Sequence, residues 1–195
     1  MIQILGLLMV VVVGFGGCRY LIKTHTEKYD NGKMSVHNGK WVEYYESGSV
    51  SWEGNWVDGK KEGKGVYYYE SGEVKLEGNY IDGKFEGKWV RYYQSGEVEW
   101  EGNYSGVEVR LGPGGEGKSV WYYESGKVKR EGNYVDGKKE GKTVRYYESG
   151  KVEWERNYVD GEEEGKSVWY DEDGNITDED IYKDGECVEM CEGDE

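Results

Sequence analysis

The sequence is poor in several residue types on which enzymes depend: its 195 residues include two His, three Cys, two Phe and one Pro. Both histidines, His25 and His37, lie near the N-terminus and belong to no nucleophile or metal-binding motif. A Gly-rich phosphate-binding motif is missing as well. We therefore expect a protein that is not an enzyme, with no catalytic residues, no cofactor and no bound metal.

Positive charge is also scarce. The chain has 25 Lys and Arg against 40 Asp and Glu, which gives a formal net charge of −15. Such a chain repels phosphate backbones and anionic lipid headgroups, so nucleic acid is excluded as a partner. The charge instead favours a protein partner that is basic.

No amphipathic helical pattern is present, and one motif recurs in its place. The stretch "YYESGEVKLEGNY", residues 68–80, has near copies along most of the chain. The Gly of each "SG" pair falls at Gly48, Gly72, Gly96, Gly126, Gly150 and Gly174. The spacing is 24 residues except for one interval of 30, which contains an insertion at residues 105–115. A fixed period of this kind predicts an array of repeated units, which we place at residues 29–186.

Each unit alternates apolar and polar residues with period 2, which indicates two β-strands. A three-residue loop at residues 70–72 would pair Tyr68 with Val74 and Val66 with Leu76, and so keep one face apolar. That loop is a type I turn followed by a Gly in the left-handed region. A recurring "DG" pair predicts the turn to the next unit. The fold class is therefore all-β: an elongated antiparallel meander of about six 24-residue β-hairpin repeats.

The first strand of each unit also predicts an interaction surface. Between its two apolar positions lies a residue that varies, and the alternation predicts that this residue is exposed. These residues are Tyr67, Arg91, Trp121, Arg145 and Trp169, and the Tyr row before each turn adds Tyr45, Tyr69, Tyr93, Tyr123 and Tyr147. The apolar face of a single sheet should curl on itself, pair with a second copy of the chain in a homodimer, or hold a partner.

The N-terminus has a different composition. Residues 1–18 are uncharged and apolar, which is typical of an export signal, and residues 19–28 form a polar linker. Gly16 and Gly17 before Cys18 resemble the lipobox of bacterial lipoproteins, in which the Cys is lipidated. This predicts a membrane-anchored lipoprotein of the bacterial cell envelope. The alternative is an uncleaved anchor with the repeats on the cytoplasmic side.

The C-terminal residues 187–195 form an acidic tail that contains "CVEMC". In an oxidising compartment Cys187 and Cys191 are candidates for a disulfide, and otherwise they are two free thiols. The spacing alone is a weak metal signal. Just before the tail, Asp178 and Asp180 replace the Trp and Gly of earlier units, and charges there discourage edge-to-edge pairing.

The units "GKGVYYYESGEVKLEGNYIDGKFEGK" and "GKTVRYYESGKVEWERNYVDGEEEGK" resemble the bacterial variant of the MORN repeat, and the chain is similar to YwqK-family antitoxin-like proteins. The resemblance implies a β-hairpin array used for protein contacts, membrane association or self-association. The expected function is a non-catalytic scaffold for protein–protein interaction at the cell envelope. Two alternatives stay open: an aromatic cage that binds choline or cell-wall glycan, and a cytoplasmic antitoxin that neutralises a basic toxin.

Overall fold

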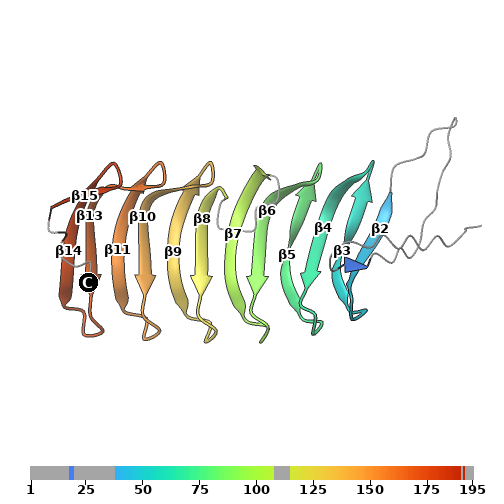
Figure 1. The fold of residues 1–195 in the computed structure, drawn as a ribbon, viewed down its shortest axis with the longest axis horizontal. Coiled ribbons are helices and arrows are strands. Elements are labelled where there is room, and N and C mark those ends of the chain that lie inside the picture. Colours follow the sequence, from blue (N-terminus) through green and yellow to red (C-terminus); the bar gives the residue numbers. More distant parts are fainter. Residues whose placement is uncertain (1–17, 20–37, 108–114, 190, 192–195) are drawn as a thin grey trace, which may run out of the picture.

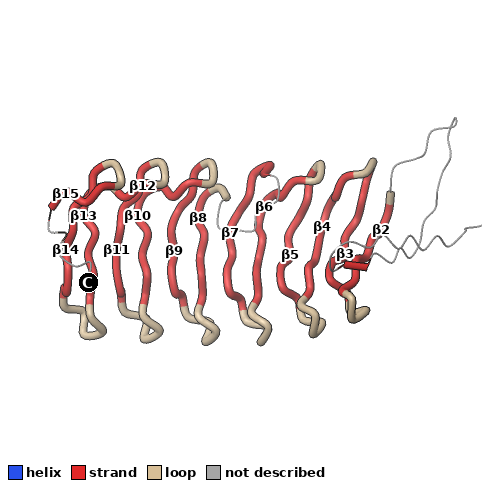
Figure 2. Tube along the Cα trace, in the orientation of Figure 1, coloured by secondary structure: helices blue, strands red, loops and turns tan. Residues whose placement is uncertain are grey.

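The structure is a computed structural model that describes residues 18–19, 38–107, 115–189 and 191. The described residues form one open antiparallel sheet, and no helix occurs among them (Figures 1 and 2). Consecutive strands stand side by side along the long axis of the molecule, so that chain order and spatial order agree (Figure 1). The prediction of an all-β antiparallel meander is confirmed.

Most strands have six to ten residues. They are β1 (Cys18–Arg19), β2 (Gly39–Tyr45), β3 (Val50–Val57), β4 (Lys60–Tyr68), β5 (Val74–Ile81), β6 (Lys84–Tyr92), β7 (Val98–Val107), β8 (Gly117–Tyr122), β9 (Val128–Val135), β10 (Lys138–Tyr146), β11 (Val152–Val159), β12 (Glu162–Glu163), β13 (Gly165–Tyr170), β14 (Ile176–Lys183) and β15 (Glu186–Glu189). Each pairs with its neighbour in the chain, except that β11 pairs with both β12 and β13.

Two kinds of turn alternate along the array. At the "ESG" turn the Gly72 N–H donates to the Tyr69 carbonyl (3.0 Å), and Gly72 has a φ of +105°. The Tyr69 N–H in turn donates to the Glu73 carbonyl (2.8 Å), which closes the predicted three-residue loop. At the "DG" turn Asp82 and Gly83 have φ values of 53° and 83°, as a type I′ turn requires. Both turn predictions are confirmed.

The register beyond the loop differs from the prediction. Tyr68 pairs with Val74 as expected, but Leu76 lies opposite Tyr67, and Val66 lies opposite Glu77. A bulge causes this, because the extra residue on β5 reverses which side chains share a face. The other complete hairpins show the same shift. The varied row of Tyr67, Arg91, Trp121, Arg145 and Trp169 therefore lies on the aromatic face of the sheet and is half-buried, not exposed on the opposite face.

The core lies on that face, in the N-terminal half of the array. Its buried members are Trp52, Leu76, Tyr80, Phe85, Trp89, Trp100 and Tyr104. The rings lie across the sheet: Phe85 stacks on Trp89 at 3.7 Å between centroids, and Trp89 is 0% exposed. A Cβ on Gly78 would approach the Trp89 ring to 2.1 Å, so glycine at this position lets the indole lie on the backbone. In this half the side chains of the sheet itself cover the apolar face.

The opposite face, called here the charged face, carries links within each hairpin and between consecutive hairpins. Glu77 forms an ion pair with Lys64 (2.8 Å) and accepts a hydrogen bond from the Tyr92 hydroxyl of the next hairpin (2.8 Å). The Lys–Glu pair recurs as Lys40–Glu53, Lys88–Glu101, Lys118–Glu131, Lys142–Glu155 and Lys166–Glu179. The Tyr–Glu bond recurs as Tyr68–Glu53, Tyr122–Glu101 and Tyr146–Glu131. The Lys–Glu pairs join the two strands of one hairpin, and the Tyr–Glu bonds join consecutive hairpins.

Several predicted segments fall outside the described residues, namely most of the N-terminal segment and linker (1–17 and 20–28), the first residues of the predicted array (29–37) and most of the insertion (108–114). Cys18 and Arg19 are described as a short strand opposite Tyr45 and Tyr44. At the other end β15 pairs with β14, so the sheet continues past residue 186 into the expected tail. Within the described ranges, no helix has the length and hydropathy needed to cross a membrane.

Candidate functional site

A single row of directly paired residues crosses the aromatic face from β2 to β14, and we call it the central ladder. It contains the varied residue of each first strand and the residue that faces it on the strands to either side. Its members in spatial order are Glu43, Trp52, Tyr67, Leu76, Arg91, Trp100, Trp121, Arg130, Arg145, Trp154, Trp169 and Asp178. The structure thus brings the five varied residues into one line, which sequence spacing alone did not show.

Aromatic rings and guanidinium groups lie next to one another in the middle of the ladder, where Trp100 and Trp121 are flanked by Arg91 and Arg130. The rings of Trp100 and Trp121 lie 6.4 Å apart, and the Arg130 guanidinium lies 3.9 Å above the Trp121 ring. Such stacking orients a guanidinium and leaves its edge available for further hydrogen bonds. Among the described residues, neither Arg91 nor Arg130 has a carboxylate within ion-pair distance, whereas Arg145 pairs with Glu153 at 2.8 Å. The middle of the ladder therefore combines flat apolar area with positive charge.

A cavity of about 200 Å³ opens beside this part of the ladder. Its lining residues are Tyr93, Glu99, Trp121, Tyr122, Lys129, Arg130 and Arg145. Trp, Tyr and Arg are the residues that contribute most to binding energy in protein interfaces, because they bury large rigid area and carry oriented polar groups. The cavity could accept a side chain that combines an apolar stem with a carboxylate.

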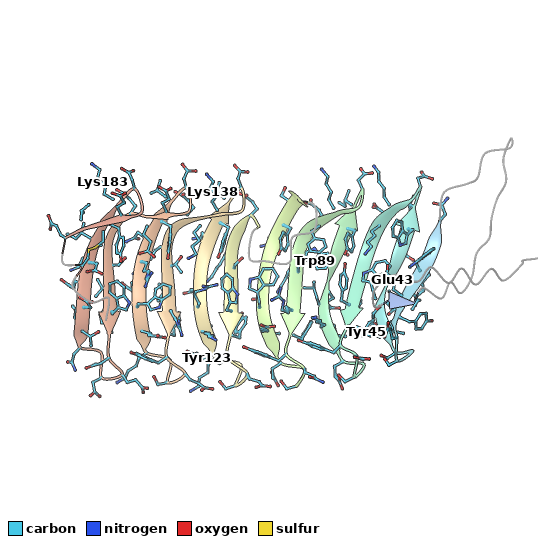
Figure 3. The ribbon with its side chains drawn as sticks, viewed as in Figure 1. Glu43, Tyr45, Trp89, Tyr123, Lys138 and Lys183 are labelled. Carbon is cyan, nitrogen blue, oxygen red and sulfur yellow. A yellow bond between two sulfur atoms is a disulfide. The ribbon has the colours of Figure 1, made fainter. Side chains whose placement is uncertain are left out.

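The predicted Tyr row has a different position and role in the structure. Tyr45 and Tyr123 lie along one long edge of the sheet, opposite the edge that carries Lys138 and Lys183 (Figure 3). Each Tyr of the row is half-buried and donates its hydroxyl to a main-chain carbonyl of the next hairpin at 2.6 to 2.7 Å. The pairs are Tyr45 to Tyr68, Tyr69 to Tyr92, Tyr93 to Tyr122, Tyr123 to Tyr146, and Tyr147 to Tyr170. These residues link the units to one another.

The links on the charged face shift the ionisation of both partners. Burial, followed by the hydrogen bond to Glu53, raises the pKa of Tyr68 to about 12. The pKa of Tyr92, Tyr122 and Tyr146 is raised to about 12 for the same reasons. The Lys40 ammonium, and then the Tyr68 hydroxyl, lower the pKa of Glu53. The structure therefore holds the tyrosines protonated and the glutamates ionised at neutral pH.

One group of rings has the geometry of a cation cage. The Lys61 ammonium lies 3.9 Å above the Trp52 ring and 5.4 Å from the rings of both Tyr67 and Tyr80. Three rings around an ammonium group is the arrangement that recognises choline and related cations. Here a lysine of the same chain occupies it.

Two candidate positions lie near the chain ends. Of Cys18, the candidate for lipidation, only the strand position opposite Tyr45 is described, and residues 1–17 before it are outside the described part of the chain. Cys187 and Cys191 are joined by a disulfide, with their Cα atoms 6.2 Å apart. Asp180, which the sequence indicated only as a charged replacement for glycine, lies beside them and is buried.

Comparison with known proteins assigns the hairpin units to a repeat class. No curated protein matches the chain. The MORN repeat family matches residues 52–74, and the MORN repeat variant family matches residues 115–136, 139–160 and 163–184. Each matched segment spans about one hairpin unit of the sheet. MORN repeats are generally non-enzymatic modules for protein or membrane interaction, and it is to the MORN repeat and its variant that these units of the chain are matched.

Proposed function

We propose that this chain is a non-catalytic repeat scaffold that binds a protein partner through the central ladder while its N-terminal segment holds it at the bacterial cell envelope. The observation that carries the proposal is the division between constant and varied residues. The links on the charged face and at the turns repeat from unit to unit, whereas the residue type at the ladder positions differs between most units. A constant frame with a varied row is the arrangement that recognition by repeat proteins uses.

The chemistry of the ladder suggests how a partner binds. The net charge of −15 attracts a basic protein and raises its rate of encounter. At the ladder, the partner buries apolar groups against Trp100 and Trp121, and its individual carboxylates pair with the Arg91 and Arg130 guanidinium groups. Steering by overall charge and contact at the ladder are thus separate contributions.

The binding claim is tested by affinity capture of the full-length chain from its host, followed by quantitative comparison of variants. We expect Trp121→Ala and Arg130→Glu to reduce capture of one specific protein at least about tenfold, as loss of an interface anchor does. Asn133→Ala is the matched control, because Asn133 is exposed on the same hairpin. Capture that survives both ladder variants, or that Asn133→Ala abolishes equally, contradicts binding through the ladder.

The envelope claim is tested by palmitate labelling and protease accessibility, with wild type compared to Cys18→Ala. We expect label on the wild type alone and repeats that are accessible outside the inner membrane. An unlabelled chain whose repeats are protected inside the cell removes the lipoprotein proposal. That result favours the cytoplasmic antitoxin-like alternative, in which co-expression with a basic toxin should restore growth.

The cage around Lys61 supports a second candidate, recognition of choline or cell-wall glycan. The rings of Trp52, Tyr67 and Tyr80 already hold one ammonium group, so a free cation has to displace it. We expect Lys61→Ala to open the cage and to create or strengthen saturable binding of choline, measured by calorimetry. Trp52→Ala in the same background should abolish it. If Lys61→Ala and wild type both fail to bind choline and glycan fragments, this candidate is excluded.

A further inference from the structure

Three positions of every hairpin unit meet on the aromatic face. In one unit they are Gly78, Phe85 and Trp89, where the two rings stack and the indole lies over the glycine. Three units later in the array they hold Arg156 and Glu163, which form an ion pair. The same 24-residue spacing places Asp180, Cys187 and Cys191 at these positions in the last unit. The fold itself therefore brings one carboxylate and two cysteine sulfurs together.

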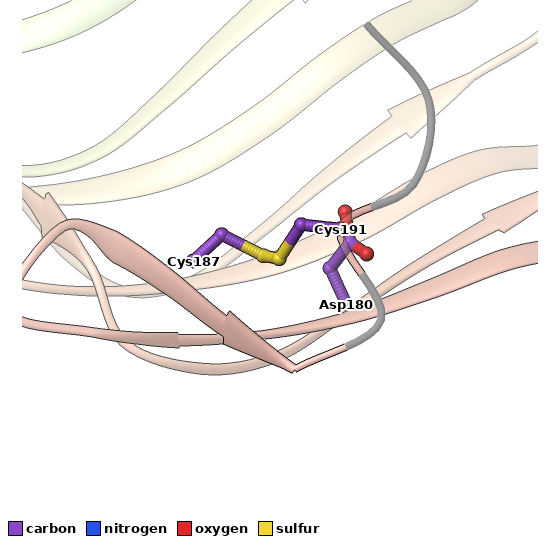
Figure 4. Close-up of side chains that lie close together, drawn as sticks. All are labelled: Asp180, Cys187 and Cys191. Atoms are coloured by element: carbon purple, nitrogen blue, oxygen red, sulfur yellow. A yellow bond between two sulfur atoms is a disulfide. The ribbon is translucent and has the colours of Figure 1, made fainter.

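The geometry of this last set is that of a metal-binding cluster. One carboxylate oxygen of Asp180 and the sulfurs of Cys187 and Cys191 all lie within 4.8 Å of one another (Figure 4). Asp180 is 8% exposed, and its Oδ1 atom has no hydrogen-bond partner among the described residues. A buried carboxylate oxygen without a partner is unfavourable, because it has lost the hydration of the unfolded chain. A cation at the cluster supplies the missing partner.

We propose that the dithiol form of this cluster is a zinc site, with Asp180, Cys187 and Cys191 as the protein ligands. Thiolate sulfur is a soft ligand and selects zinc over calcium or magnesium, and carboxylate oxygen completes many zinc sites. Two sulfurs at the usual zinc distance in a tetrahedral site lie about 3.8 Å apart, so the two bonded sulfurs have to move apart once the disulfide is reduced, while the Asp180 oxygen already lies within 4.8 Å of both. Solvent takes the fourth position.

The disulfide and the zinc site are two alternative states of the same sulfurs. A dithiol reductant transfers two electrons to the Cys187–Cys191 bond and is itself oxidised to a disulfide, while each cysteine sulfur takes up one proton. Zinc binding then displaces those two protons, since only thiolates coordinate the metal. The disulfide closes a short loop between β15 and the residues that follow it, whereas the zinc state in addition joins this loop to β14 through the Asp180 carboxylate.

Zinc binding is tested on the full-length chain carrying Cys18→Ser, so that Cys187 and Cys191 are the remaining thiols. The chain is reduced with a phosphine under nitrogen and titrated with Zn²⁺ against a chromogenic chelator, and with Co²⁺ to record thiolate charge-transfer absorption. We expect one metal ion per reduced chain and none per oxidised chain. Cys187→Ser should abolish the charge-transfer pattern of two thiolates, and Asp180→Asn should weaken Zn²⁺ binding at least about tenfold.

Asp178→Asn is the matched control, because Asp178 is an exposed aspartate two residues earlier on β14. It should leave the affinity unchanged. Circular dichroism of each metal-free variant establishes that it is folded. In the Cys18→Ser chain, bound Zn²⁺ should also protect Cys187 and Cys191 from an alkylating reagent, and this measurement needs no substitution of a zinc ligand. Absence of binding or protection in the reduced chain overturns the proposal. Equal binding by the oxidised chain, or by Asp180→Asn, overturns it as well.

Discussion

The two halves of the array share one frame and differ in what covers the aromatic face. In the N-terminal half the position of Trp89 holds an indole that is 0% exposed, stacked on Phe85. In the C-terminal half the same position holds Thr143, which is 2% exposed and whose hydroxyl has no hydrogen-bond partner among the residues that the structure describes. Charged residues take part in the face there: Thr143 lies opposite Arg156, and the Lys139 ammonium lies 4.1 Å above the Tyr158 ring. The backbone register is nevertheless the same in both halves.

This difference shows that the backbone frame of the array does not depend on which side chains cover the aromatic face. The turns, the Lys–Glu pairs and the tyrosine links repeat through both halves, so they suffice to set strand order and register. The face residues add stability where they are aromatic and allow variation where they are not. Substitutions at equivalent positions of the two halves can therefore measure the two contributions separately.

The largest expected effect comes from removing the buried indole. Trp89→Ala should destabilise the array by about 3–5 kcal/mol, because it removes a fully buried aromatic side chain and leaves a cavity. Thr143→Ala, at the equivalent position, should cost less than about 1 kcal/mol, since the hydroxyl that it deletes makes no hydrogen bond within the described part of the chain. Urea unfolding followed by circular dichroism measures both. Equal losses would show that the two halves are stabilised in the same way.

The next effect tests why glycine faces that indole. Gly78→Ala places a methyl group 2.1 Å from the Trp89 ring and should cost about 1–3 kcal/mol through overpacking. In a Trp89→Ser background, which copies the residue found at Ser119 and Ser167, the same change should cost clearly less. The difference between the two costs is the coupling energy of the pair. A coupling energy near zero would mean that the backbone shifts to relieve the contact.

Much of this architecture could be predicted from the sequence, because its period and turn residues report local geometry. The three-residue loop, the type I′ turns and the meander follow from "ESG", "DG" and the alternation. The bulge after Val74 could not be derived from alternation, which assumes one residue per pleat. The sequence did contain one signal of the bulge: the positions of Lys64 and Glu77 hold opposite charges in every unit, and such a constant pair indicates that the two residues share a face.

The site was harder to predict than the fold for the same reason. The alternation did not predict the one bulge residue in each unit, so it placed Tyr67 and its equivalents on the wrong face. Their alignment with Trp52 and Leu76 was therefore not predicted. The cluster of Asp180 with the two cysteines depends on the pairing of β14 with β15. Contacts of this kind require the register between strands, which a single sequence does not contain.

A third prediction concerns the tyrosine–glutamate links of the charged face, and we expect the same effect in both halves of the array. The pKa of Tyr92 and of Tyr146 is raised to about 12 in the folded chain, against about 10 when unfolded. Their contribution to stability is therefore complete below pH 10 and is lost as the pH rises toward 12, because the unfolded chain ionises first. Tyr92→Phe and Tyr146→Phe should each reduce this alkaline loss by a similar amount. Urea midpoints between pH 9 and 12 measure it, and a flat profile in the wild type would contradict the assignment.

The smallest effect is expected from the ion pairs at the "DG" turns, one in each half. Lys60 lies 3.0 Å from Asp82, and Lys138 lies 3.4 Å from Asp160, and all four side chains are more than half exposed. Exposed pairs contribute about 0–1 kcal/mol, so Lys60→Ala and Lys138→Ala should each change the free energy of unfolding by less than about 1 kcal/mol, and by less still in high salt. Differential scanning calorimetry at low and high salt measures both. A larger or salt-independent loss in one half would mean that the alkyl part of the lysine packs against the next turn, where a Cβ added at Gly83 or Gly161 would lie within 4 Å of the lysine side chain.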